Sequence, residues 1–327
     1  MVKLFHRGQT LATFVEVYRR DTYPSLRANT RYGYDSVLRA HILPVFGGRR
    51  LGDVDQRSVQ TWVNDLSAAG LSPRTVEACF AVLSTIIGLA AEYGLAAPLA
   101  RRGRGRSGVR LPKKRPAHRE PPTVEQIGRL ARVIHPDAGP AFIYTAGFCG
   151  LRKSELFGLA PSAIDFEHHR LRVCRTKEQA TGQLVDMTKN GKARWVTMTG
   201  PVEDALRDHL AARPDADLVF HRNGRSFDSS GFHKRVWRPA REAAGLPGLW
   251  LHDLRHAAAS IMIAYGWSPK RVQRELGHHT AAFTLDRYTH ELERRDDDPG
   301  RLELTEVLLR ELAAAKPNTL EEATHNG

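Results

Sequence analysis

The chain has 327 residues, a length that allows two domains, and its formal net charge of +13, with an isoelectric point near 10, favours a polyanionic partner. The three cysteines, Cys79, Cys149 and Cys174, are odd in number and lack CxxC spacing, which argues against a disulfide framework and a zinc site. The sequence contains no run of 18 apolar residues and no signal-peptide core, so we expect a cytoplasmic protein without a membrane partner.

Residues 10–98 show the apolar spacing of a small helical bundle. The second expected helix ends at Pro44, because proline cannot continue a helix, and the third ends at Gly70. Ser72 is an N-cap followed by Pro73 at the first helical position, and together they open a fourth helix. A bundle of this kind names no function by itself.

The stretch 99–120 is predicted to be a basic interdomain linker. Nine Lys and Arg and no acid lie between Arg101 and Arg119, so this segment carries most of the excess charge. Cations in such a segment are expected to follow a phosphate backbone and to make binding depend on salt. The predicted phosphate contacts are Arg74, Arg101, Arg102, Arg104, Arg106, Arg110, Lys113, Lys114 and Arg115.

Residues 121–292 are predicted to form a second domain that combines helices with a small β-sheet. A helix breaks at Gly150, strands at 171–174 and 194–198 flank a polar hairpin, and a further helix opens near His252. The fold class is therefore mainly α with a small sheet: an N-terminal helical bundle followed by an α+β domain.

Five short islands occur in this second domain in a fixed order. They are 150–156 (GLRKSEL), 188–191 (TKNG), 252–256 (HDLRH), 276–278 (LGH) and Tyr288. Together they supply the groups that breaking a phosphodiester requires. A tyrosine hydroxyl can form a covalent intermediate, planar arginine forks can stabilise the charge on the phosphoryl oxygens, and a lysine with a lowered pKa can protonate the leaving oxygen.

In order and spacing, these islands resemble the tyrosine recombinase (phage integrase) family, and the resemblance extends over nearly the whole chain. It implies that Tyr288 is the nucleophile and that Lys189 is the general acid. It assigns the scissile phosphate to three donors, Arg152, Arg255 and His278. It further implies that His252 assists proton transfer and that Glu155 is a carboxylate that holds Arg152 in place.

A metal site is the main alternative for part of this set. His252 and His256 lie four residues apart on an expected helix, but no glutamate occupies the HExxH position and Arg255 would repel a cation, so we expect no metal. Tyr288 taken alone would most often be a packing aromatic. The hairpin lysine has two rivals on the same stretch of chain, Lys177 and Lys192.

The family layout implies that 10–98 is a helical, SAM-like core-binding domain and that 121–292 is the catalytic domain, the two closing around a duplex. The implied substrate is double-stranded DNA with inverted-repeat core sites, bound by a tetramer across two sites, with a directionality factor as a further partner. A 3′-phosphotyrosyl intermediate and a Holliday junction would need neither ATP nor a cofactor. Only nine residues precede the first expected helix, so the arm-binding domain of some members is expected to be absent or truncated.

The tail 293–327 is acidic and is not expected to lie on DNA. Leu304, Leu308 and Leu312 place an apolar stripe along one helix face. Two interpretations stay open: a helix that caps its own domain, and one that docks on a neighbouring protomer, as the tails of family members do.

Three rival functions share these features. An Xer-type resolvase would use the same chemistry, although the run 282–288 looks more like integrases of mobile elements. A type IB topoisomerase would cut without exchanging strands. A DNA-binding regulator that has lost catalysis would keep the fold, but every predicted catalytic position is filled. We therefore expect a nucleoid-associated, integrase-like recombinase.

Overall fold

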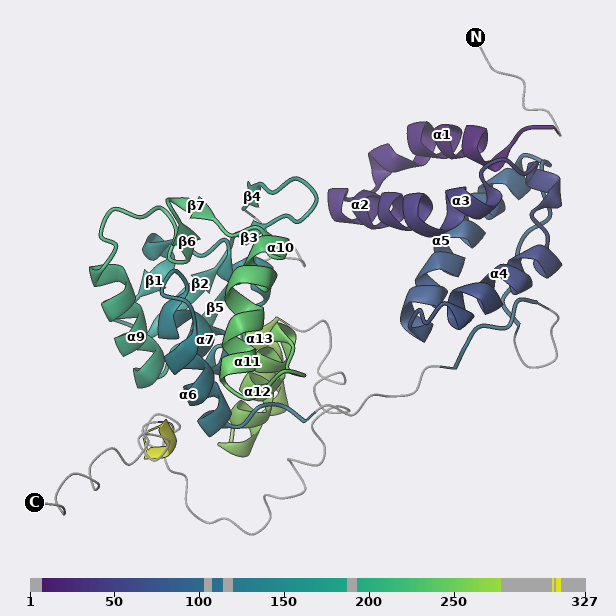
Figure 1. Ribbon diagram of the computed structural model, residues 1–327. Coiled ribbons are helices and arrows are strands. Elements are labelled where there is room, and N and C mark those ends of the chain that lie inside the picture. Colours follow the sequence, from purple (N-terminus) through teal and green to yellow (C-terminus); the bar gives the residue numbers. More distant parts are fainter. Residues whose placement is uncertain are drawn as a thin grey trace, which may run out of the picture. The chain divides into compact units, whose positions relative to one another are not determined.

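The computed structural model describes residues 8–102, 108–113, 120–186, 193–277, 308 and 310–312. The chain divides into two compact units, Met1–His118 and Arg119–Gly327 (Figure 1). Each unit has its own apolar core. The fold is mainly α-helical with small antiparallel sheets, as the sequence predicts.

Helices make up the regular structure of the first unit: α1 (Leu11–Thr22), α2 (Ala28–Val37), α3 (Leu43–Phe46), α4 (Gln56–Ala68) and α5 (Pro73–Glu92). Three of them begin at side-chain caps, and Thr10 is the cap of α1. Asp55 and Ser58 form a capping box on α4, and Ser72 Oγ accepts a hydrogen bond from the Thr75 N–H at the start of α5. The predicted opening of α5 at Ser72 is therefore confirmed.

The prediction that Pro44 ends the second helix is wrong. The chain continues from α2 through a π-helical turn, Leu38–Ile42, directly into α3, and Pro44 lies in the first turn of α3. In the π turn the Leu43 N–H donates to the Leu38 carbonyl, five residues back. A wider turn followed by a fresh helix start suits a residue that has no N–H to give.

Helix α5 is the central apolar element of the first unit. By length and composition it could cross a membrane, a property that it shares with the core helices of soluble proteins. It buries eight side chains, including Phe80, Leu83 and Ile87, in the same core as Phe14 and Trp62. In this unit α5 is a core helix.

The second unit surrounds a small sheet with helices. The elements up to the sheet are α6 (Val124–Val133), α7 (Gly139–Phe148), α8 (Lys153–Leu156), β1 (Ile164–Asp165), β2 (Arg170–Val173), β3 (Thr176–Lys177), β4 (Leu184–Val185) and β5 (Arg194–Thr197). Those that follow are α9 (Gly200–Ala211), β6 (His221–Arg222), β7 (Arg225–Ser226), α10 (Ser229–Phe232), a π turn (His233–Trp237), α11 (Arg238–Ala243), α12 (Leu251–Ala264) and α13 (Pro269–Leu276).

The largest of the sheets has the strand order β1-β2-β5, with both pairs antiparallel. Leu171 pairs with Val196, and both side chains point into the core, whereas the neighbouring pair of Arg172 and Trp195 is exposed. This alternation is what a sheet with one solvated face requires. The strands expected at 171–174 and 194–198 are therefore present as β2 and β5.

Helix α7 lies in the middle of the second unit and is apolar on all sides, as a fully buried helix is. Phe142 on this helix contacts the rings of Phe157, Phe220 and Phe232 at centroid distances of 6.3, 5.1 and 4.9 Å. Helices α6, α9 and α12 all pack against α7. The rigid end of α7 leads directly into the turn that carries Arg152.

The described part of the tail packs on the second unit. Leu308 is fully buried in the core of that unit, and Leu312 packs against the same core beside Gly128. The Tyr265 hydroxyl donates to Glu311 Oε1 at 3.1 Å. The described residues of the tail thus pack on their own domain, as in the first of the two interpretations above.

Candidate active site

Arg152 stands at the start of α8, after a turn that requires glycine. Gly150 adopts a left-handed φ of +67°, which L side chains rarely adopt. The backbone N–H and Nη1 of Arg152 donate to the two carboxylate oxygens of Glu155 at 2.8 and 2.9 Å. Its Nη2 donates to the Gly277 carbonyl at 2.9 Å. The side chain remains 22% exposed.

Glu155 is almost completely buried and binds a second arginine as well. Arg194 on β5 donates from Nη1 and Nη2 to the two oxygens of Glu155, both at 2.9 Å. Burial by itself would raise the pKa of Glu155, but the hydrogen bonds and charge of Arg194, with the charge of Arg152, lower that pKa to about 2. The predicted contact between Glu155 and Arg152 is present, whereas Arg194 was predicted only as a strand residue.

Arg255 comes from the first turns of α12 and is buried. Its Nη1 donates to the Gly150 carbonyl and its Nη2 to the Leu276 carbonyl. The side chain thus joins the turn before Arg152 to the end of α13. Since Arg152 binds the very next carbonyl, that of Gly277, the two predicted phosphate-binding arginines converge on adjacent peptide groups.

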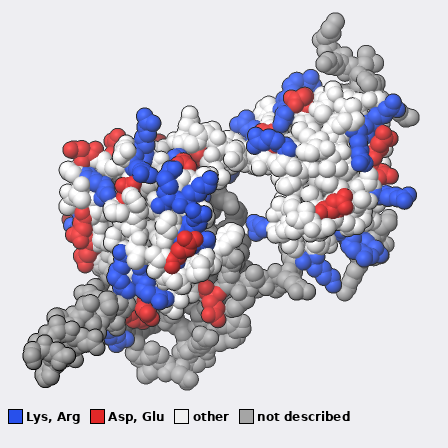
Figure 2. Space-filling view, viewed as in Figure 1, with Lys and Arg blue, Asp and Glu red and all other residues white. Residues whose placement is uncertain are grey.

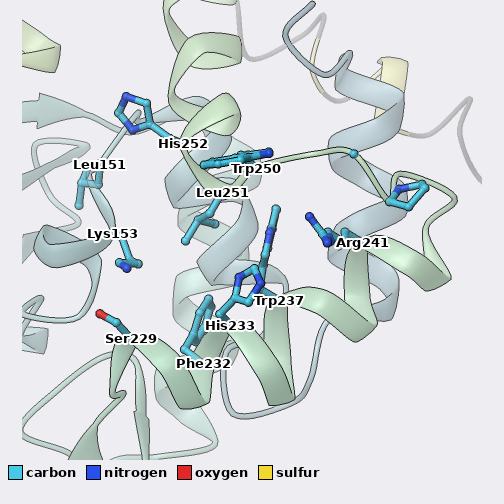
Figure 3. A pocket seen from close by; sticks show the side chains of 12 residues that line it. Leu151, Lys153, Ser229, Phe232, His233, Trp237, Arg241, Trp250, Leu251 and His252 are labelled. Carbon is cyan, nitrogen blue, oxygen red and sulfur yellow. The ribbon is translucent and has the colours of Figure 1, made fainter. Parts of the chain in front are cut away.

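His252 lies one turn before Arg255 on α12, at the rim of a pocket of about 760 Å³. Figure 3 shows the rings of His252 and Trp250 at the same end of the pocket, with the rings of Phe232 and His233 at the opposite end. Trp250 is 60% exposed, and burial lowers the pKa of Lys153. Phe232 and Trp237 are among the apolar residues that line the pocket.

His252 and His256, the two residues considered as metal ligands, lie next to each other on α12. The rings of His252 and His256 meet edge to face, with centroids 4.9 Å apart. Among the residues that the structure describes, no group of three or more His, Cys, Asp or Glu could hold a metal ion.

Three predicted catalytic residues, Lys189, His278 and Tyr288, lie outside the described residues, as does the alternative Lys192. The other alternative, Lys177 on β3, donates its Nζ to the carbonyls of Ser226 and Phe227 at 3.1 and 2.7 Å. Burial lowers the pKa of Lys177. Its ammonium group is thus held by backbone carbonyls of the second unit.

The predicted phosphate contacts in the first unit are exposed where the structure describes them; these are Arg74, Arg101, Arg102, Arg110 and Lys113. Arg101 forms an ion pair with Glu77 at 2.8 Å. Leu99 and Val109, from the stretch expected to be linker, are buried in the core of the first unit. The remaining predicted contacts, Arg104, Arg106, Lys114 and Arg115, lie outside the described residues.

Comparison with known proteins places this arrangement in a family. A model described as the phage integrase family matches residues 140–295, a range that holds all five islands. A second, described as the N-terminal SAM-like domain of phage integrases, matches residues 10–67. The chain belongs to the phage integrase family of tyrosine recombinases. By this membership it is a tyrosine-type site-specific recombinase.

Curated relatives of this tyrosine recombinase include the putative prophage phiRv2 integrase of Mycobacterium tuberculosis (strain H37Rv). It is 28% identical over 286 residues, which cover 85% of this chain and 74% of the relative. A XerC-like tyrosine recombinase of Caldanaerobacter subterraneus subsp. tengcongensis is 24% identical, covering 74% and 69%. Integrases and Xer-type enzymes are thus both among the relatives.

Solved structures with the same fold include two integrases in complexes with DNA. The Tn1549 transposon integrase, in complex with circular intermediate DNA, gives a TM-score of 0.68 at 18% identity, covering 87% of this chain and 99% of that one. A lambda integrase (75–356) dimer bound to a COC′ core site gives 0.62 at 16% identity, covering 90% and 99%. At these identities the likeness concerns the fold.

Proposed function

We propose that this recombinase cuts and rejoins DNA strands with Tyr288 as the nucleophile and Arg152 and Arg255 as the phosphate clamp. The observation that carries this proposal is the convergence of the two arginines on the Leu276 and Gly277 carbonyls. The next residue in the sequence is His278, the third predicted donor. Two arginines held at one short segment, with a third predicted donor next in the sequence, can stabilise the negative charge of a phosphoryl transition state.

The geometry of Arg152 suits a phosphate ligand. An arginine has five N–H groups, and the side chain of Arg152 uses one on Glu155 and one on Gly277. The remaining N–H groups belong to a side chain that is partly exposed. A planar fork that is already held on two sides can bind two phosphoryl oxygens with little further loss of rotamer freedom.

The proposed reaction needs no external energy source. Tyr288 Oη attacks phosphorus, the P–O5′ bond breaks, and Lys189 protonates the departing oxygen while His252 assists proton transfer. A 3′-phosphotyrosyl bond conserves the energy of the phosphodiester, and the free 5′ hydroxyl of a partner strand then attacks that bond and releases Tyr288. We propose double-stranded DNA with inverted-repeat core sites as the substrate, bound by a tetramer across two sites, with a directionality factor as a further partner.

Surface charge supports a DNA partner beyond the basic stretch 99–120. Figure 2 shows Lys and Arg side chains on the visible faces of both units, with Asp and Glu among them. The net charge of +13 supplies the nonspecific part of DNA affinity.

The first test is covalent capture of DNA. The protein is incubated with supercoiled plasmid in EDTA without ATP, and protein–DNA adducts and plasmid relaxation are followed, with genomic DNA that flanks the gene as a second substrate. We expect adducts with the wild type and none with Tyr288→Phe, which should still bind DNA. Adducts formed by Tyr288→Phe would remove Tyr288 from its role, and DNA binding without adducts on either substrate would favour a DNA-binding regulator.

A further inference from the structure

The C-terminal end of α13 is held by arginines from three different elements. Three successive carbonyls each accept a hydrogen bond from a different guanidinium; the pairs are Glu275 with Arg194 Nε (2.7 Å), Leu276 with Arg255 Nη2, and Gly277 with Arg152 Nη2 (2.9 Å). Terminal carbonyls lack partners within the helix and carry the negative end of its dipole, so they attract cations. Two of these arginines belong to the proposed clamp, and Arg194 is the third.

Arg194 and Arg152 share Glu155 but differ in what they offer a ligand. Arg194 uses Nη1 and Nη2 on the two oxygens of Glu155 and Nε on Glu275, and its side chain is only 10% exposed. Arg152 puts a single side-chain hydrogen bond on Glu155 and is 22% exposed. Arg194 engages all three of its guanidinium nitrogens, whereas Arg152 engages two and is the more exposed of the two side chains.

A second set of hydrogen bonds joins β5 to α13. The Glu275 carboxylate accepts hydrogen bonds from the N–H and the hydroxyl of Thr197, at 2.9 and 3.1 Å. Gly277 is left-handed with a φ of +65°, and a Cβ there would lie 3.2 Å from Arg194 Cδ. The Arg194 side chain therefore packs directly on the residue that precedes His278.

We propose that Arg194 is a positioning residue of the active site. This inference rests on the proposed function. By occupying both oxygens of Glu155, Arg194 prevents that carboxylate from taking the whole fork of Arg152 into a bidentate pair. By binding Glu275, it fixes the end of α13, from which the chain continues to His278.

Loss of Arg194 should expose Glu155 to titration. The charged groups acting directly on the Glu155 carboxylate are Arg194 from β5 and Arg152 from the start of α8. The pocket beside it is also lined by Arg172, Arg175 and Asp186. With one of its two paired cations gone, a buried carboxylate has a higher pKa and can become protonated in the acid part of the working pH range.

The test compares Arg194→Gln and Arg194→Lys with a matched control, Arg170→Lys. Arg170 lies on the adjacent strand β2, where it pairs with Asp165 and forms neither a hydrogen bond nor an ion pair with Glu155 or Glu275. DNA affinity is measured separately from the rate of adduct formation. For Arg194→Gln we expect affinity within about 3-fold of wild type and an adduct rate lower by about 10- to 100-fold, because a small misplacement of a catalytic group has such effects.

Two further features separate positioning from a general loss of structure. As the pH is lowered from 8 to 5, the adduct rate of Arg194→Gln should fall more steeply than that of wild type. Arg194→Lys, which keeps the charge but not the fork, should recover part of the rate. In a double-mutant cycle with Glu155→Gln, the two losses should be less than multiplicative, because both substitutions break the same contact.

A titration independent of recombination keeps this inference distinct from the proposed function. The ¹³C chemical shift of the Glu155 carboxyl reports its ionisation. In wild type this shift should stay constant between pH 8 and 5, because the carboxylate remains ionised. In Arg194→Gln the carboxylate should become protonated at a higher pH than in wild type. If wild type forms no adducts, the proposed function fails, and this titration still decides whether Arg194 controls Glu155. An unchanged titration, a wild-type adduct rate in Arg194→Gln, or an equal loss of rate in Arg170→Lys would overturn the proposal.

Discussion

Glu155 shows how a buried charge can organise a site that must bind another charge. A buried carboxylate is costly unless it is paired and hydrogen-bonded, and here both oxygens accept from guanidinium groups. The family resemblance implied its contact with Arg152, which lies three residues earlier at a helix start. The contact with Arg194 could not be predicted, because that residue lies 39 positions further on in what reads as an alternating strand.

A pH dependence of stability follows from Glu155. Its pKa falls from an ordinary value near 4.5 in the unfolded chain to about 2 in the folded one, so the stabilisation is complete above pH 4.5 and is lost as the pH falls towards 2. The shift corresponds to about 3 kcal/mol. We expect Glu155→Gln to be less stable than wild type by about 3 kcal/mol or more at pH 7, because two arginines lose their anion.

The measurement is urea unfolding of both proteins between pH 7 and 2.5. Tryptophan fluorescence reports chiefly on the second unit, which holds four of the five tryptophans. The difference in unfolding free energy between the two proteins should shrink as the pH falls below 4.5. A difference that stays constant down to pH 2.5 would show that Glu155 is not ionised in the folded state.

At the scale of elements, α7, α12 and α13 meet at two left-handed glycines, Gly150 after α7 and Gly277 at the end of α13. The break after α7 could be predicted, because Gly150 precedes a helix start. In the structure Gly150 has a left-handed φ, and its carbonyl accepts a hydrogen bond from Arg255. The path of α13 could not be predicted, since its partners come from strands and helices far away in sequence. Local patterns also misplaced the break at Pro44, because a π turn let the chain continue as a helix.

Gly150→Ala should therefore destabilise the second unit more than an ordinary left-handed glycine would. An added Cβ would overlap Leu276 Cδ2 and lie 3.1 Å from the Ala258 Cβ, besides straining the backbone at a φ of +67°. We expect a loss of about 2–4 kcal/mol, from strain and overpacking together. Gly245→Ala is the control: its φ is +72°, but no atom lies within 4 Å, so strain alone should cost about 1 kcal/mol.

Thermal and urea unfolding of the two glycine variants would check this comparison. Gly150→Ala should also slow adduct formation, because the shift propagates to the Leu276 carbonyl that holds Arg255. Equal losses of stability in the two variants would mean that the turn at Gly150 has room to relax.

At the scale of the whole molecule, the distribution of charge is read directly from the sequence, whereas the packing of side chains is the hardest feature to predict. The basic stretch 99–120 was expected to be a free linker, yet Leu99 and Val109 are buried in the first unit, and the Gln60 side chain hydrogen-bonds the backbone of Arg110. Apolar residues spaced among many cations give no periodic signal, so only the folded unit shows that they pack. Part of the stretch is thus held in place before any ligand binds.

This anchoring gives the salt dependence of DNA binding a specific origin. The side chains of Arg110 and Lys113 are exposed and make no ion pair with any residue that the structure describes, unlike Arg101, which is paired with Glu77. Each phosphate contact contributes about 0.9 to the slope of log affinity against log salt concentration. Replacing both residues by glutamine should lower the slope by about 2 and weaken binding to all sequences alike.

The measurement is the affinity for a duplex of random sequence, determined by fluorescence anisotropy. Several salt concentrations between about 50 and 300 mM are used, a range that brackets physiological ionic strength. Arg207→Gln is the matched control, because Arg207 is exposed but lies over Phe166 on the second unit and is not a predicted contact. The control should keep the wild-type slope. If the control changes the slope by about half as much as the double variant, in proportion to the charges removed, DNA affinity follows net charge alone. An unchanged slope in the double variant would place the DNA away from this part of the first unit.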